Sequence, residues 1–400
     1  MHDEATLIAT IAVSLVFAFA GGFIAVRLRL SPLVGYLAAG IVVGPFTPGF
    51  VADAHLAPQL AEIGVILLMF GVGLHFSVAD LLAVRAIAVP GAMAQIVVAT
   101  IMGVVAGWCW GWTFGAGLVL GLALSVASTV VLLRGLEALG DLNSRDSRIA
   151  IGWLIVEDLV MVLLLVVLPA IAGWLGGHAT EETGRPLWLA LVLTAVKIVV
   201  FIGLMLLVGK RVFPWLLARV ERTGSRELFT LAVSSLALGT AFGSAKFFGV
   251  SYALGAFFAG VVLNESELSH RAAASLESLQ DAFGVLFFVA VGMLFNPAIL
   301  VREPWRVLVV LAIILVGKSL AALVIVLVLR HSRSTAFTVS AALAQIGEFS
   351  FILAGLGVGL GLFPEEGISL ILAGALISIT LNPFLFRLVA KGKRVSSAAG

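Results

Sequence analysis

Long stretches without a charged side chain decide what this sequence can fold into. Residues 5–26 contain no Asp, Glu, Lys or Arg, and the same is true of residues 86–133. An α-helix needs about 20 apolar residues to cross a bilayer, so the second stretch is long enough for two spans and a turn. Transmembrane strands would show ten-residue segments of alternating character, and these stretches are too long and too uniformly apolar for that. We therefore predict an all-α polytopic membrane protein.

Composition supports a chain that lies within the membrane. Hydrophobic residues make up 61% of the 400 residues and charged residues 12%, against about 25% charged residues in soluble domains. This excludes a soluble enzyme and a disordered chain. The single cysteine excludes an internal disulfide and a cysteine metal cluster, and the six histidines form no HExxH pattern. No Walker A sequence is present, so we expect no enzyme activity, no metal site and no bound cofactor.

Hydropathy divides the chain into thirteen predicted spans, with no loop long enough to fold alone. Spans one to six and eight to thirteen form two halves, and span seven joins them. An odd joining span would invert the second half relative to the first in the membrane. The predicted spans cover residues 5–26, 32–49, 58–76, 86–107, 114–134, 148–172, 187–208, 227–244, 250–264, 281–299, 305–329, 335–360 and 367–388.

The distribution of basic residues predicts the orientation of these spans. If the N-terminus lies outside, the inner loops carry 18 of the 24 lysines and arginines and the outer loops carry 4, as the positive-inside rule requires. We therefore expect a protein of the plasma (bacterial inner) membrane, with the lipid bilayer as partner, no bound nucleic acid and a cytoplasmic C-terminus. Residues 1–390 form one transmembrane domain, and residues 391–400 a basic cytoplasmic tail. Trp108, Trp110 and Trp112 are typical of an interfacial aromatic belt rather than of a stacking site.

Four ionisable residues lie at similar depth near the middle of predicted spans, Glu348 of span twelve among them, and a charge there costs about 2.5–3.5 kcal/mol. Glu157 and Asp158 are adjacent in span six, and Lys318 is in span eleven. Adjacent helical residues point about 100° apart, so one carboxylate can face an aqueous cavity while the other faces Lys318. One interpretation is a buried structural ion pair with a spare carboxylate. The interpretation that we favour is a proton- and cation-binding site.

Span five adds neutral oxygen atoms at a similar depth. Ser125, Ser128 and Thr129 follow an i, i+3, i+4 spacing, which predicts that they line one face of a helix. Hydroxyls in apolar helices often bond back to their own helix, and that alternative stays open for each of them. Beside the two carboxylates, three hydroxyls on one face favour an ion-binding site.

Span twelve occupies the matching position in the second half of the chain. Its Gly347 is flanked by Gln345 and Glu348, which predicts a break in the helix. Inverted repeats with broken helices near the middle of the membrane are typical of secondary transporters. The residues by themselves therefore favour a transporter with two broken helices.

Several motifs, taken together, resemble those of a known family. Their order and spacing are similar to the membrane domain of Kef-type monovalent cation:proton antiporters, in the cation:proton antiporter-2 family. The similarity runs almost from end to end. The motifs are GVILLMFGVGLHFSVADLLAVR at 64–85, LGLALSVASTVVLL at 120–133, VED at 156–158, SRELFT at 225–230, GVSYALGAFFAGVVL at 249–263, GVLFFVAVGM at 284–293, VGKS at 316–319 and LAQIGEFSF at 343–351.

The resemblance implies the sodium/proton antiporter fold, which has inverted repeats and two parts. Core helices at about 86–172 and 305–388 would slide against dimerisation helices at about 5–76 and 227–299, with residues 187–208 as a linker helix. Spans five and twelve would cross as broken helices. The resemblance also implies a homodimer and an elevator-type alternating-access mechanism. The transported species would be protons and a monovalent cation, potassium rather than sodium.

The resemblance further assigns roles to single residues. Asp158 corresponds to the essential ion-binding aspartate, and Lys318 to a charge-compensating lysine on a neighbouring core helix. Glu157 departs from the family pattern, in which glutamine often precedes the aspartate, so it could pair with Lys318 or carry another proton. The polar residues of the two helix breaks correspond to Ser128, Thr129, Gln345 and Glu348.

The residues leave two other functions open, and the resemblance implies one further partner. A ligand-gated potassium efflux channel on the same fold would lack strict coupling to protons. An intramembrane enzyme with paired carboxylates would need them on facing helices, whereas Glu157 and Asp158 are adjacent on one helix. Kef-type chains often continue into a cytoplasmic nucleotide-binding regulatory domain, so such a domain beyond residue 400 is a candidate partner.

Overall fold

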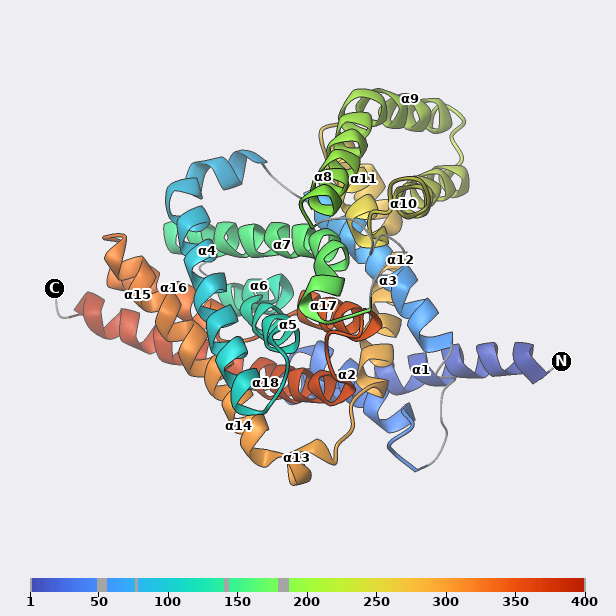
Figure 1. The fold of residues 1–400 in the computed structure, drawn as a ribbon. Helices are drawn as coiled ribbons and strands as arrows, with labels where there is room; N and C mark the ends of the chain where they lie inside the picture. Colours follow the sequence, from blue (N-terminus) through green and yellow to red (C-terminus); the bar gives the residue numbers. More distant parts are fainter. Residues whose placement is uncertain (1, 49–55, 76–77, 140–143, 179–186, 399–400) are drawn as a thin grey trace.

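The computed structural model describes residues 2–48, 56–75, 78–139, 144–178 and 187–398, and its regular structure in these ranges is helical. Figure 1 shows the two ends of the chain on opposite sides of the molecule, with α17 near its centre. A 3₁₀ turn at Ala172–Leu175 and π-helical turns at Met205–Gly209 and Ile313–Lys318 extend three of the helices. The α-helices are α1 (His2–Arg27), α2 (Pro32–Val43), α3 (Leu56–His75), α4 (Val78–Cys109), α5 (Phe114–Ser125), α6 (Thr129–Leu139), α7 (Arg145–Ile171), α8 (Leu187–Leu204), α9 (Lys210–Glu221), α10 (Arg226–Phe248), α11 (Tyr252–Asn264), α12 (Ser269–Met293), α13 (Ile299–Arg302), α14 (Pro304–Ala312), α15 (Ser319–Val328), α16 (Arg333–Leu343), α17 (Glu348–Gly359) and α18 (Glu365–Ala398).

Many of these helices can cross a membrane. Within the described ranges, eight helical segments are long and apolar enough, and the bent pair α16–α17 makes a ninth. Pro32–Val43, Gln59–His75 and Tyr252–Asn264 are shorter apolar helices. The all-helical polytopic class is thus confirmed, while the number of thirteen spans stays a prediction. The last helix continues to Ala398, so the predicted tail at 391–400 begins as part of that helix.

Two sets of helices pack mainly among themselves. In the scaffold set (α1–α3 and α10–α12), α3 packs against α11 and α12, and α2 against α1 and α12. In the core set (α4–α7 and α14–α18), α4 packs against α5 and α7, α15 against α16, and α17 against α5. Figure 1 shows α1, α3 and α12 on one side and α4, α15 and α16 on the other.

Glycines allow the backbones of these helices to approach closely within each set. A Cβ atom on Gly260 of α11 would collide with the carbonyl oxygen of Phe70 in α3, and one on Gly121 of α5 would collide with Thr100 of α4. Helices in a bilayer associate largely by such close packing, because lipid tails are as apolar as leucine. The many glycines of the sequence are therefore used at helix crossings in both sets.

The first interrupted helix lies in the core set. Helix α5 ends at Ser125, Val126 is extended (φ −91°, ψ 138°), and α6 begins at Thr129. The prediction that Ser125, Ser128 and Thr129 line one face of a helix is therefore wrong. The chain is unwound between the first and the last of them, so helical spacing does not apply across this segment.

The second interrupted helix lies at the matching position of the second half. Helix α16 ends at Leu343 and α17 begins at Glu348, with a bend of 46° between them. Gly347, which caps α17, is extended (φ −121°, ψ −168°). The break that we predicted around Gly347 is confirmed.

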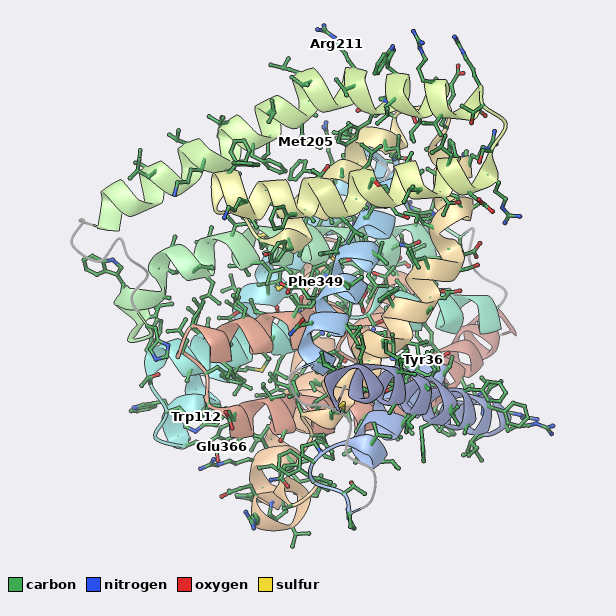
Figure 2. The ribbon with its side chains drawn as sticks, turned by 90° about the vertical axis from the view of Figure 1, so that its right-hand side faces the viewer. Tyr36, Trp112, Met205, Arg211, Phe349 and Glu366 are labelled. Atoms are coloured by element: carbon green, nitrogen blue, oxygen red, sulfur yellow. The ribbon has the colours of Figure 1, made fainter. Side chains whose placement is uncertain are left out.

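An aromatic and ionic cluster joins the two halves of the core set near one end of the molecule (Figure 2). Arg306 of α14 forms an ion pair with Glu366 of α18 at 2.8 Å, and its guanidinium lies over the rings of Trp110 and Trp112 at 5.5 and 5.9 Å. Those two rings also contact each other edge-on. The prediction of an aromatic belt suits Trp108, which is 78% exposed, whereas Trp110 and Trp112 make edge-on and cation–π contacts within the protein.

Candidate functional site

The two interrupted helices touch where they are unwound. Gln345 Oε1 accepts a hydrogen bond from the Ser128 N–H at 3.0 Å, and Gln345 Nε2 donates one to the Ser128 carbonyl oxygen at 3.0 Å. A Cβ atom on Gly347 would lie 2.8 Å from the Ser128 Cα. Glycine is the residue that permits such a close approach of two backbones. Gln345 and Gly347 therefore bring the second break directly against the first.

Lys318 donates hydrogen bonds to carbonyl groups at the C-terminal ends of two half-helices. Its side chain is fully buried, and Nζ donates to the carbonyl oxygens of Leu124, near the end of α5, at 3.3 Å and of Gln345, after α16, at 2.9 Å. A positive charge is stabilised at a helix C-terminus, where the helix dipole is negative. Lys318 interacts electrostatically with Glu157, but among the described residues it forms no ion pair within 4.0 Å with Glu157 or Asp158. Its direct partners are carbonyl groups instead.

Glu157 and Asp158 point in different directions from α7. Glu157 is fully buried, and its Oε2 accepts a hydrogen bond from the Ala127 N–H in the first break at 2.9 Å. Asp158 is partly exposed, and its Oδ2 accepts a hydrogen bond from the Thr129 hydroxyl at 3.2 Å. One carboxylate thus satisfies the unwound backbone, and the other belongs to a residue that is only partly buried.

The hydroxyl groups of predicted span five also differ in their partners. Ser125 Oγ donates to the Leu122 carbonyl oxygen of its own helix at 2.7 Å, which is the alternative that the sequence left open. Ser128 Oγ accepts a bond from the Val131 N–H at 3.4 Å, and it also lies beside the carboxylate of Glu348. Thus Ser125 bonds within its own helix, whereas Ser128 connects the start of α6 with the start of α17.

Three partly exposed oxygen-bearing side chains remain at the crossing. They belong to Asp158, Thr129 and Glu348, and the negative charges of Glu348 and Glu157 both act on Asp158. Carboxylate and hydroxyl oxygens are the ligands that hard cations prefer. The same negative charge attracts a proton equally well, so the accessible part of the crossing can bind either species.

Sequence reasoning missed two residues that hold the breaks together. Gln95 of α4 is fully buried, and its Nε2 donates to the Ser125 carbonyl oxygen at 3.0 Å. Asn382 of α18 donates from Nδ2 to the Ala341 carbonyl oxygen at 2.9 Å. Both are amides inside predicted spans, and this was the available signal, because a buried amide in an apolar helix needs a partner.

These contacts repeat between the two halves of the chain. The helix before each broken helix supplies a donor to a carbonyl end, Gln95 for α5 and Lys318 for α16. The helix after each broken helix supplies a further polar side chain, Glu157 for the first break and Asn382 for the second. An inverted repeat places corresponding residues at corresponding points, which accounts for this pattern.

Known proteins resemble this chain over almost its whole length. The family model described as "Sodium/hydrogen exchanger, transmembrane" matches residues 12–392. The "Putative cation/proton antiporter YbaL" of Escherichia coli strain K12 is 60% identical over 395 residues, which cover 98% of this chain and 70% of that protein. The "K(+) efflux antiporter 4" of Arabidopsis thaliana is 31% identical over 385 residues, which cover 96% of this chain and 64% of that protein.

The fold has a counterpart of known structure. The sodium proton antiporter MjNhaP1 from Methanocaldococcus jannaschii, at pH 8, matches with a TM-score of 0.69 and 18% sequence identity, over 97% of this chain and 98% of that chain. This confirms the sodium/proton antiporter fold that the sequence predicted. The chain therefore belongs to the sodium/hydrogen exchanger family of transmembrane proteins and is homologous to the Kef-type potassium efflux antiporters.

Proposed function

We propose that this protein exchanges a monovalent cation, potassium rather than sodium, for protons, and that Asp158 binds both in turn. The observation that carries the proposal is the contrast between the two acids of α7. Glu157 is buried and accepts a hydrogen bond from the Ala127 N–H, whereas Asp158 is partly exposed and accepts one from the Thr129 hydroxyl. An ionised carboxylate in an apolar setting must be neutralised, and either a proton or a metal cation can do this. The two species therefore compete for one site.

The surroundings of Asp158 support this competition, because the other charges are matched by helix ends. Lys318 lies at the carbonyl ends of α5 and α16, where a helix dipole favours a cation. Glu157 accepts a bond from the Ala127 N–H just before α6, and Glu348 lies in the first turn of α17. Both are places where the dipole favours an anion. Asp158 is then the group whose charge the transported ion neutralises.

We propose alternating access by an elevator-type movement, and the division into two sets of helices supports it. The crossing lies entirely within the core set, so sliding that set past the scaffold set would carry Asp158 across the membrane. We propose a homodimer held by the scaffold set, with the N-terminus outside and the C-terminus in the cytoplasm. The choice of potassium is supported by the plant relative, a protein whose name specifies K(+) efflux.

Replacing Asp158 tests this function. In proteoliposomes that contain a pH-sensitive dye, we expect cation-dependent proton flux from the wild-type protein with potassium, and none from Asp158→Asn, because an amide carries no negative charge and cannot bind and release a proton in turn. Asp281→Asn removes an exposed acid of α12 and should exchange like the wild type. Exchange retained by Asp158→Asn would reject the assignment, and potassium flux without coupled proton flux would favour the channel.

A further inference from the structure

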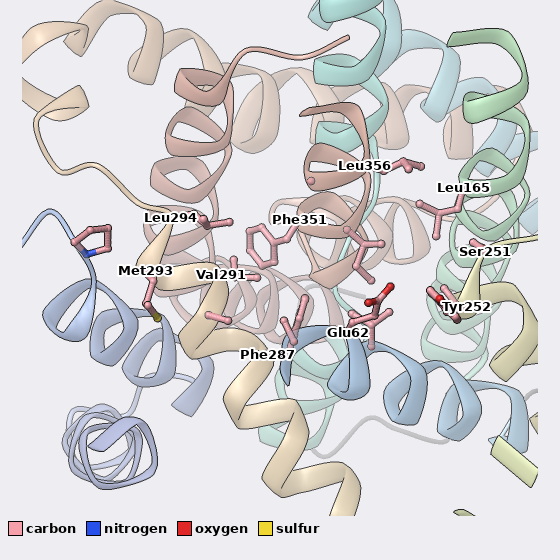
Figure 3. Close-up of a pocket in the computed structure, with 17 residues that line it drawn as sticks. Glu62, Leu165, Ser251, Tyr252, Phe287, Val291, Met293, Leu294, Phe351 and Leu356 are labelled. Atoms are coloured by element: carbon pink, nitrogen blue, oxygen red, sulfur yellow. The ribbon is translucent and has the colours of Figure 1, made fainter. Parts of the chain in front are cut away.

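A cavity between the two sets of helices contains a carboxylate that the exchange site does not use. Its volume is about 550 Å³. One wall comes from the scaffold helices α3, α11 and α12, and the other from α7 and α17 of the core set. Figure 3 shows Glu62 projecting from α3 toward the helix that bears Phe351. The cavity therefore lies along the boundary that an elevator movement would use.

Glu62 is an exposed acid at this cavity. The other side chains that line the cavity are largely apolar, with Ser251 and Tyr252 as the hydroxyl-bearing exceptions. Among the described residues, no hydrogen bond or ion pair involves the Glu62 carboxylate. No basic side chain among the residues that line the cavity neutralises its charge, so the carboxylate can attract a cation.

The cavity is lined by two helices that also carry residues of the exchange site. Leu165, which lines it, follows Asp158 on α7 by seven residues, or about 10 Å along a helix that rises about 1.5 Å per residue. Phe351, which also lines it, lies about one turn beyond Glu348 on α17. The cavity also reaches the start of α11 and the end of α12, so it lies at one face of the protein. An ion that enters the cavity at this face comes near Glu62.

We propose that Glu62 is a loading site, at which a monovalent metal cation is held by carboxylate and hydroxyl oxygens before it passes to Asp158. Alkali cations are hard ions that bind oxygen ligands, and Glu62 with the hydroxyls of Ser251 and Tyr252 provides these. A fixed negative charge beside an apolar cavity raises the local concentration of cations. The inference rests on the exchange function proposed above and adds a site that acts from one face.

Transport kinetics at each face test the loading site. Cys109, the single cysteine, is exposed at the end of α4 and reports protein orientation through an impermeant maleimide. At low ionic strength we expect Glu62→Gln to raise the KM for the cation by about tenfold at the face where α3 begins, with kcat unchanged. Added N-methylglucamine chloride should shrink this difference, because salt screens the charge. Glu62→Asp should stay near the wild type, and Tyr252→Phe should raise KM less.

Glu365→Gln is the matched control, because Glu365 is exposed at the start of α18 and does not line the cavity. A KM for Glu62→Gln equal to that of the wild type, or an equal rise for Glu365→Gln, would overturn the loading site. A change confined to kcat would also contradict it, since loading affects capture of the ion. If the wild-type protein shows no exchange, the proposed function fails, which is a different result from intact exchange that is insensitive to Glu62.

Discussion

At the scale of single residues, neighbouring acids in α7 have different partners. Glu157 accepts a bond from a backbone N–H in the first break, while Asp158 accepts one from the Thr129 hydroxyl. The second oxygen of Glu157, Oε1, and Nε1 of Trp153, one turn earlier, form no hydrogen bond of regular geometry with the described residues, although the two side chains interact with each other. Glu157 thus resembles a helix cap more than a transport residue, although it is adjacent to Asp158 in the sequence.

The cap interpretation predicts that Glu157→Gln retains exchange. The glutamine oxygen can still accept the Ala127 N–H bond, and the buried charge is removed. Glu157→Leu leaves that N–H without an acceptor, at a cost of about 1–3 kcal/mol, so its melting temperature should fall well below that of Glu157→Gln. Initial rates in proteoliposomes and thermal melting of the purified protein measure both effects.

Glu277 is an exposed acid of α12, and the variant Glu277→Gln serves as the control for this pair of variants. It should match the wild type in both rate and melting temperature. The cap interpretation would be wrong if Glu157→Gln changed the number of protons moved for each cation, since Glu157 would then carry a proton itself.

At the scale of elements, each break is held by side chains from other helices. Carbonyl groups before the breaks accept bonds from Gln95, Lys318 and Asn382, and N–H groups in the first break donate to Glu157 and Gln345. An unwound segment inside a bilayer is tolerated when protein groups satisfy its backbone. Side chains from neighbouring helices therefore satisfy much of the unwound backbone at the crossing.

The close contact of the two breaks predicts a large effect of one methyl group. In Gly347→Ala, the added Cβ would lie 2.8 Å from Ser128 Cα, and overpacking of this kind costs about 1–3 kcal/mol. Because the neighbouring atoms are backbone, relief requires the breaks to separate, so we expect a lower melting temperature and a loss of exchange.

Gly359→Ala provides the comparison for this substitution. It lies at the end of the same helix, and a Cβ atom there would meet nothing within 4 Å. Its melting temperature and exchange rate should equal those of the wild type. Full activity of Gly347→Ala would mean that the breaks need not stay in contact during transport.

At the scale of the whole molecule, the boundary between the scaffold set and the core set separates parts with different roles. The crossing and its supporting side chains belong to the core set, whereas Glu62 projects from the scaffold set. The cavity of about 550 Å³ leaves part of this boundary unpacked. A boundary with open space can slide more easily than a close-packed one, because tightly interdigitated side chains resist displacement.

Sliding predicts that a cross-link across the cavity stops exchange. In a Cys109→Ser background, we would place cysteines at Ala61 of α3 and Ile352 of α17, which line opposite walls. A bifunctional methanethiosulfonate reagent should abolish exchange, and reduction should restore it. Cysteines at Ala61 and Ala290, both in the scaffold wall, give the control. Equal inhibition of the two pairs would indicate that the reagent blocks the cavity without stopping any movement.

Hydropathy and charge by themselves determined most of the architecture. Uncharged stretches such as residues 86–133 must be helical in a bilayer, because a helix satisfies its own backbone. The depth of Asp158 and Lys318 marked the middle of the membrane for the same reason, since charges there are costly. Gly347 between polar residues was enough to predict the second break. These features are local, so a single sequence contains them.

The partners of the polar groups were decided by the tertiary structure. Gln345 meets Ser128 across 217 positions of the chain, and Lys318 meets Leu124 across 194. Spacing along a helix says nothing about such pairs, and it misled the grouping of Ser125 with Thr129, because the helix unwinds between them. Which of the two acids is buried and which is partly exposed depends on where the crossing helices place their backbone N–H groups. Packing over the whole core set decides the positions of these groups.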